Sequence, residues 1–291
     1  MSPIKLLPVR KGFFQSFISS FSLTVNLIII NVLFFILFYL ASILSNLLFG
    51  TSLINYLAVQ ANSLFLQGYV WTLLTSMFLH AGLFHLIVNM FSLYFLGSFL
   101  EMIIGKKRFF WFYISSGIFA ALFFAILAFL FGNGLLGARI FGSPETFAVG
   151  ASGTIFAIAG LLAVLTPKNR VYLLIGPLFA IIFESILVHF FANSSWISFM
   201  DILVTIYIFI SIFGLLTNLR GTKLALPVEL PFWLLPFVAI IPLVVIGLFI
   251  DLPIGNSAHL GGFIFGVFYG FYLRYKYKSK TQRIAEYFSK K

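Results

Sequence analysis

Residues 23–48, LTVNLIIINVLFFILFYLASILSNLL, form an apolar run without a single charge. A helix needs about 20 apolar residues to cross the hydrocarbon core of a bilayer, and this run is longer. It is also longer than a signal-peptide core and has no evident cleavage site, so we expect a retained span. The whole chain is 62% hydrophobic and 9% charged, and such a composition cannot provide a water-facing surface. We therefore predict an all-α, polytopic membrane protein.

Seven further apolar segments follow, which gives about eight predicted spans. They are residues 81–101, 109–131, 150–166, 171–192, 197–218, 231–250 and 257–275. If the N-terminus is cytoplasmic and all eight segments span, then all but one of the 18 Lys and Arg residues, Arg139, fall on the cytoplasmic side. This distribution fits the positive-inside rule. It predicts a multi-pass protein of the plasma membrane with both termini in the cytoplasm.

The chain divides into a cytoplasmic N-terminal segment (1–22), a membrane domain (23–275) and a basic cytoplasmic tail (276–291). We interpret the net charge of +11 as contact with membrane lipids, and we expect no binding of nucleic acid. The chain has no cysteine, which excludes disulfides, thiolate zinc sites and cysteine nucleophiles. The oligomeric state is not indicated by any pattern.

Residues 50–76 make a long apolar connection between the first two spans. Connections longer than about 12–15 residues are often functional. We expect this one to be structured at the outer interface, where Tyr69 and Trp71 are typical belt residues.

Four polar residues within the spans fall at one predicted level. His85 and Asn89 are four apart on the second span and share a face. Ser152 begins the fourth span and His259 begins the eighth, and both of these spans run inward from the outer side. One polar residue alone would be read as an interhelical hydrogen bond, whereas four at one level indicate a functional site.

Small residues recur at every third or fourth position on the fourth and eighth spans and form one stripe on each. The stripes are Gly153, Ala157 and Gly160 on the fourth span, and Ala258, Gly262, Gly266 and Gly270 on the eighth. Such stripes let two helix backbones approach closely. We expect this approach to bring Ser152 within hydrogen-bond distance of His259.

A serine is a weak nucleophile until a base removes its proton, and histidine suits that role near neutral pH. The free N–H groups at the helix start beside Ser152, with His85 and Asn89 as side-chain donors, could hold an oxyanion. Asp251 precedes His259 by eight residues and lies near a span end, so no carboxylate is placed as a third member. We therefore predict a Ser–His dyad.

Four stretches of the sequence resemble the rhomboid family of intramembrane serine proteases. They are WTLLTSMFLHAGLFHLIVNM (71–90), EMIIG (101–105), VGASGTIFAIAG (149–160) and AHLGGFIFG (258–266). A lone G-x-S-x-G is a weak signal. Joined with H-x-x-x-x-H-x-x-x-N upstream and A-H-x-x-G-x-x-x-G downstream, each on its own span, it becomes highly specific.

The resemblance implies that Ser152 is the nucleophile and His259 the general base, with His85, Asn89 and the backbone at Ser152 forming the oxyanion site. It implies a six-helix core that uses neither metal nor cofactor. It also implies that the substrates are single-pass membrane proteins, cut within their transmembrane segments near the outer side. Substrates are expected to enter between the second and fifth core spans, the fifth being residues 231–250 here.

The supporting residues of the family also have counterparts. By resemblance, His80 is a structural histidine beneath the first loop, and Gly150 shapes the turn before the serine. Phe156 occupies a position that can be tyrosine, and it could stack on His259 without hydrogen bonding to it. Glu101 matches a glutamate that helps anchor the first loop, although Thr72 stands where the family often has arginine.

The segments 171–192 and 197–218 form an extra hairpin (about 171–222) inserted into the six-helix core. The hairpin has no counterpart role in the family, and we expect a lipid-facing appendage. Glu184 and His189 on it are five apart and on different faces, and Asp201 is expected to be interfacial.

Four other classes of membrane protein predict different sequence features. A zinc protease needs H-E-x-x-H, and no histidine here is followed by glutamate. An aspartyl type needs two intramembrane aspartates, and Asp201 and Asp251 both lie near span ends. A transporter would favour a carboxylate at mid-membrane, for which Glu184 is the nearest candidate. A catalytically inactive, helix-binding relative with a quality-control role is the main alternative, and the presence of both Ser152 and His259 argues for the enzyme.

Overall fold

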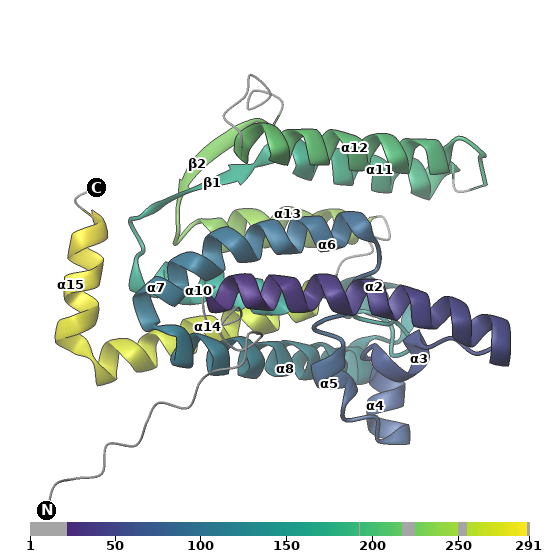
Figure 1. Cartoon of the computed structure of the whole chain (residues 1–291), viewed down its shortest axis with the longest axis horizontal. Helices are drawn as coiled ribbons and strands as arrows, with labels where there is room; N and C mark the ends of the chain where they lie inside the picture. Colours follow the sequence, from purple (N-terminus) through teal and green to yellow (C-terminus); the bar gives the residue numbers. More distant parts are fainter. Residues whose placement is uncertain (1–21, 192, 217–224, 250–254, 290–291) are drawn as a thin grey trace, which may run out of the picture.

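The computed structural model describes residues 22–191, 193–216, 225–249 and 255–289 (Figure 1). Long helices lie side by side in a bundle, with α15 across one end and the short helices α3–α5 near the other. In chain order the elements are α2 (Leu23–Phe49), α3 (Ile54–Leu57), α4 (Ala61–Gln67), α5 (Thr72–Thr75), α6 (Leu83–Ser92), the π-helix η1 (Leu93–Gly97), α7 (Ser98–Ile104), α8 (Lys106–Phe131), α9 (Gly134–Phe141), α10 (Ser152–Leu165), β1 (Arg170–Leu174), α11 (Ile175–Phe191), α12 (Ile197–Leu216), β2 (Pro227–Pro231), α13 (Leu235–Gly247), α14 (Asn256–Lys276) and α15 (Lys278–Ser289).

Several helices have the length and composition to cross a membrane. Four long apolar helices do, namely Leu23–Phe49, Leu83–Ile104, Lys106–Phe131 and Ile197–Gly214. Three shorter apolar helices accompany them, Ser152–Leu165, Ile175–Phe191 and Leu235–Gly247, and α14 adds 21 residues. The predicted polytopic, all-helical bundle is thus confirmed in its fold class, and each predicted span contains a helix.

Hydrogen bonds from Ser22 and Glu101 fix the point at which α2 begins. The Val25 N–H donates a hydrogen bond of 3.2 Å to the Ser22 hydroxyl, which caps the helix. The buried Glu101 carboxylate accepts from the Leu23 N–H at 2.9 Å and the Thr24 N–H at 2.8 Å. A carboxylate is favourable at a helix N-terminus because the free N–H groups there carry partial positive charge. We expected Glu101 to anchor the first loop; its hydrogen bonds hold the start of α2 instead, because α7 places it there.

Helix α10 occupies the centre of the bundle and packs against α8 and α14. The predicted small-residue contact is confirmed. A Cβ added at Gly262 would overlap the carbonyl oxygen of Gly153, and one at Gly266 would overlap that of Ala157. The backbones of α10 and α14 are therefore in direct contact, which a larger side chain would prevent.

Two predicted spans begin later than their hydropathy indicated. Residues Arg170–Leu174 form strand β1, which pairs antiparallel with β2 in the register Arg170↔Pro231. Helix α11 therefore begins at Ile175 and α13 only at Leu235. An apolar strand and an apolar helix have the same hydropathy, so a count of apolar residues could not separate them.

The inserted hairpin, α11 and α12, extends from this two-stranded ribbon and lies along the bundle (Figure 1). Ile208 of α12 is fully buried, and the α12 side chains around it pack on α6. The contact consists of Val204, Ile208 and Ile212 against Phe84, Ile87, Val88 and Phe91. The expected lipid-facing appendage therefore also packs on the core through one face of α12, because apolar residues four apart on α12 match an apolar face of α6. Other α12 side chains, such as Phe209, are exposed.

The connection between the first two spans is structured, as predicted, and consists of α3, α4 and α5. The Trp71 indole donates a hydrogen bond of 2.8 Å to the carbonyl of Tyr56 and stacks on Tyr69 at 4.8 Å. The basic tail is helical from Lys278 to Ser289. We call the end of the bundle where α8 begins and α14 ends the basic end, since its Lys and Arg residues gather there. The N-terminal segment before Ser22, and Asp251, lie outside the described residues.

Candidate active site

Ser152 and His259 are 107 residues apart in the sequence and adjacent in space. Ser152 is the first residue of α10, and His259 lies in the first turn of α14. The His259 Nε2 atom is 2.8 Å from the Ser152 hydroxyl oxygen, a hydrogen-bond distance. His259 is 9% exposed. This geometry is that of a hydroxyl whose proton can pass to a neighbouring imidazole.

The His259 ring is held against an aromatic side chain. Phe156, one turn after Ser152 on α10, stacks on it with ring centroids 4.4 Å apart and an interplanar angle of 23°. The stacking predicted from the sequence is confirmed. It fixes the plane of the imidazole, so that Nε2 faces the serine.

Ser257 is a supporting residue that the sequence analysis missed. Its buried hydroxyl donates a hydrogen bond of 2.6 Å to the carbonyl of Phe141 at the end of α9. This bond ties the start of α14, two residues before His259, to the segment that follows α8. The only signal in the sequence was a serine near a helix start, which is too common to single out.

The turn before Ser152 brings Gly150 against His85 and Asn89. Gly150 has φ of +118°, which side chains disfavour, and its N–H donates to the Ser76 carbonyl at 2.8 Å. A Cβ at Gly150 would lie 2.7 Å from the His85 ring and 3.4 Å from Asn89 Nδ2. The structure thus places His85 and Asn89 beside the turn that carries Ser152, and glycine is needed for that approach.

Both side chains present hydrogen-bond donors at this turn. The Ala81 N–H donates to His85 Nδ1 at 3.4 Å, so in the neutral ring Nε2 carries the hydrogen. Asn89 Nδ2 is buried and has no hydrogen-bond partner within the described residues. A buried donor without a partner is costly and is often found where a ligand supplies the missing acceptor. The free N–H groups at the start of α10 lie at the same turn, so hydrogen-bond donors from α6 and α10 gather there.

His80 lies behind these donors. It is 2% exposed, and its ring centroid is 5.2 Å from that of His85. Burial, together with the neighbouring His85, lowers the pKa of His80 to about 3, so the ring is neutral near pH 7. This position, in the segment between α5 and α6, suits a packing role.

The hairpin residues belong to a separate group. Glu184 lies on α11 and Asp201 near the start of α12. His189 is exposed near the end of α11. In the part of the chain that the structure describes, no three His, Asp or Glu side chains group as metal ligands would.

Comparison with known families decides what this fold is. Residues 67–219 and 205–276 match the family model of the rhomboid domain. The chain belongs to the rhomboid family. Its matched residues include every polar side chain described above around Ser152 and His259.

This rhomboid has both active and inactive relatives by name. It is 35% identical over 111 residues to Rhomboid protease GluP of Bacillus subtilis, covering 38% of this chain and 19% of GluP. It is 40% identical over 73 residues to Inactive RHOMBOID-like protein 8 of Arabidopsis thaliana, covering 25% of this chain and 21% of the relative. RHOMBOID-like protein 1 of the same plant is 37% identical over 93 residues, 32% of this chain and 20% of the relative. These matches span about a fifth of each relative. Membership of the rhomboid family, together with the apolar helices, indicates a multi-pass integral membrane protein.

Proposed function

We propose that this rhomboid is an intramembrane serine endopeptidase with Ser152 as nucleophile and His259 as general base. The observation that carries the proposal is the distance of 2.8 Å between Ser152 Oγ and His259 Nε2. The donors of His85 and Asn89 beside the same turn support it. No metal or cofactor enters the proposed reaction.

In the proposed reaction, Ser152 Oγ attacks the carbonyl carbon of the scissile peptide while His259 takes the serine proton. The oxyanion of the tetrahedral intermediate accepts hydrogen bonds from His85 Nε2–H, Asn89 Nδ2–H and the backbone N–H at Ser152. His259 then donates the proton to the departing amine, which leaves an acyl-enzyme. Water, activated by His259, hydrolyses that ester and restores the serine. One lost oxyanion donor typically costs about 10²–10³ in kcat.

The proposed substrates are transmembrane segments of other membrane proteins. A peptide carbonyl within a helix is already hydrogen-bonded, so the segment must unwind before Ser152 can reach it. Small or helix-weakening residues lower that cost and are the expected sites. The proposed setting is the plasma membrane, with the membrane domain 23–275 between two cytoplasmic termini, as the distribution of Lys and Arg predicts.

A second function has one observation in its favour, which is that a relative bears the name of an inactive protein. An inactive rhomboid would bind transmembrane helices without cutting them. The presence of both Ser152 and His259 at hydrogen-bond distance argues for the protease.

The test is cleavage by purified protein in liposomes, using a single-pass fluorogenic substrate and a fluorophosphonate probe. Wild type is compared with Ser152→Ala and His259→Ala. Two matched controls, Ser115→Ala and His189→Ala, remove exposed residues of the same types. Cleavage and labelling in wild type and controls alone would support the dyad. Cleavage that survives Ser152→Ala would disprove the assignment of the nucleophile, and folded wild type that neither labels nor cleaves would favour the helix-binding function.

A further inference from the structure

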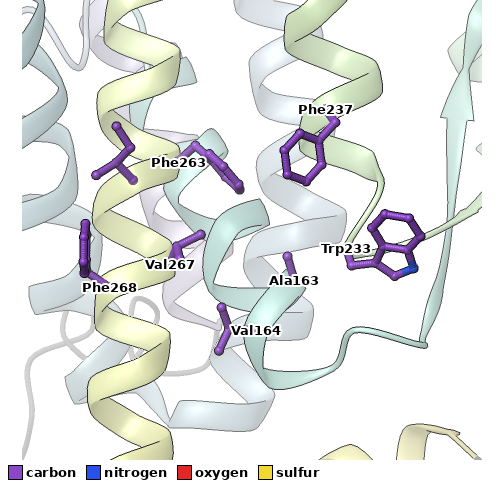
Figure 2. A pocket seen from close by; sticks show the side chains of 8 residues that line it. Ala163, Val164, Trp233, Phe237, Phe263, Val267 and Phe268 are labelled. Carbon is purple, nitrogen blue, oxygen red and sulfur yellow. The ribbon is translucent and has the colours of Figure 1, made fainter.

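A crevice of about 360 Å³ opens between α10, α13 and α14. Figure 2 shows side chains from these three helices around it, among them Ala163, Phe263 and Val267, together with Trp233 from the turn before α13. Its wall is almost entirely carbon. In a membrane-spanning chain such a surface is solvated by lipid rather than by water.

Two aromatic side chains of the lining meet at the end of the crevice that lies nearer to His259 along α14. Phe237 of α13 and Phe263 of α14 pack edge to face with ring centroids 5.7 Å apart. Phe263 lies one turn after His259 on α14. The remaining lining residues follow α14 and α10 toward the basic end, so an occupant enters from there.

Two exposed cations, Arg274 and Lys168, lie beyond the crevice toward the basic end. Arg274 is seven residues, or about two turns, beyond Val267, and therefore lies on the same face of α14. Lys168 follows α10 and comes directly after Pro167. The backbone N–H of Trp233 donates a hydrogen bond of 3.4 Å to the Pro167 carbonyl. The loop that carries Lys168 is thus fixed beside Trp233, which lines the crevice.

The spacing of these features matches one leaflet. From Phe263 to Arg274 is eleven residues of helix, or about 16 Å at 1.5 Å per residue. Half of a hydrocarbon core about 30 Å thick is about 15 Å. An acyl chain that ends at Phe263 would therefore place its phosphate at the level of Arg274.

We propose that the crevice binds one acyl chain of an anionic phospholipid from the leaflet at the basic end. The chain lies between α13 and α14 with its end against Phe237 and Phe263, and Arg274 and Lys168 bind the phosphate. A transmembrane helix, about 10–12 Å wide, needs more space than the crevice of about 360 Å³ offers. A free phosphate would leave the apolar wall unused. The proposal holds whether or not the rhomboid cleaves peptides.

The headgroup half of the site is tested by native mass spectrometry of the full-length protein with phosphatidylglycerol or phosphatidylcholine. Wild type should retain one phosphatidylglycerol at least tenfold more tightly than phosphatidylcholine. The double variant Arg274→Gln/Lys168→Gln should lose most of that preference. The double variant Lys280→Gln/Arg283→Gln removes the same charge from α15 and should keep it. Equal retention of both lipids by wild type, or an equal loss in both double variants, would overturn the proposal.

The acyl-chain half is tested by filling the crevice. Ala163→Phe should abolish retention of the tightly held lipid, whereas Ala41→Phe, at an exposed position on α2, should not. Val267→Phe fills the same space from α14 and serves if Ala163→Phe fails to fold. Undiminished retention in a folded crevice-filling variant would show that the lipid lies elsewhere. Inorganic phosphate that displaces the lipid from wild type would show that the headgroup alone is recognised, and would also overturn the proposal.

Discussion

Glu101 of α7 accepts two hydrogen bonds from Thr24 of α2, one from its N–H at 2.8 Å and one from its hydroxyl at 2.7 Å. A third comes from the N–H of Leu23 at 2.9 Å. Glu101 is 7% exposed, and its charge is compensated by the positive end of α2. Removing it would leave buried donors without partners, which costs about 1–3 kcal/mol.

We therefore expect Glu101→Ala to lower the midpoint of thermal unfolding in detergent, while Glu145→Ala, an exposed control, leaves it unchanged. Differential scanning fluorimetry with a tryptophan readout measures both. Equal midpoints for the two variants would contradict a structural role for these three hydrogen bonds.

Gly262→Leu should abolish proteolysis. A side chain at this position would overlap the Gly153 carbonyl, so α14 must move away from α10 and take His259 from Ser152. The loss should appear in fluorophosphonate labelling as well as in cleavage. Gly82→Ala is the control, since a Cβ there meets nothing within 4 Å. Full activity of Gly262→Leu would show that the close contact is not required.

Gly150→Ala should lower kcat about a hundredfold with little change in KM. The added methyl group would displace the His85 ring, and the backbone at φ of +118° would be strained as well. The double variant Gly150→Ala/His85→Ala should be little worse than either single variant, because both changes remove the same donor. Multiplicative effects in the double variant would mean that Gly150 acts independently of His85.

Phe156→Ala should reduce kcat about two- to tenfold, since an aromatic stacking contact contributes about 0.5–1.5 kcal/mol. Phe156→Tyr keeps the ring over His259 and should retain activity. The two variants compared at fixed pH with one substrate test this. An equal loss in both would mean that the ring plane is not what Phe156 contributes.

Ile208→Ala tests the contact between the inserted hairpin and α6. Ile208 is fully buried at that contact, and α6 also carries His85 and Asn89. A cavity there should loosen α6 and lower kcat more than it changes KM, with faster limited proteolysis of the hairpin. Phe209→Ala, next along α12 but 54% exposed, is the control. An unchanged kcat in Ile208→Ala would show that catalysis does not depend on the contact between the hairpin and α6.

The proximity of Ser152 and His259 was predictable because it depends on features that a sequence displays directly. Span direction set their common depth, and the glycines at 153 and 262 set the separation of their helices. The approach of Gly150 to His85 could be anticipated only through the family resemblance, since nothing in the residue types reports a φ of +118°.

Other features could not be predicted from the sequence because they depend on pairing between residues far apart along the chain. The ribbon of Arg170–Leu174 with Pro227–Pro231 is set by pairing across more than fifty residues, and local hydropathy favoured a helix at the same place. Likewise, Glu101 could be recognised as important without any indication that its partner is the first turn of α2, because their pairing spans 77 residues.

The ribbon also explains how a core of this kind tolerates an addition. Arg170 and Pro231 face each other across the two strands, so the core chain leaves and returns at nearly the same point. Paired strand residues have Cα atoms only about 5 Å apart. The ribbon therefore holds the two core segments together whether a short turn or two helices join its strands, and the packing of α12 on α6 is a separate contact. The hairpin of α11 and α12 could therefore be lengthened, replaced or deleted in evolution while Ser152 and His259 kept their geometry. The β1–β2 ribbon is accordingly a natural point for diversification and a practical one for protein engineering.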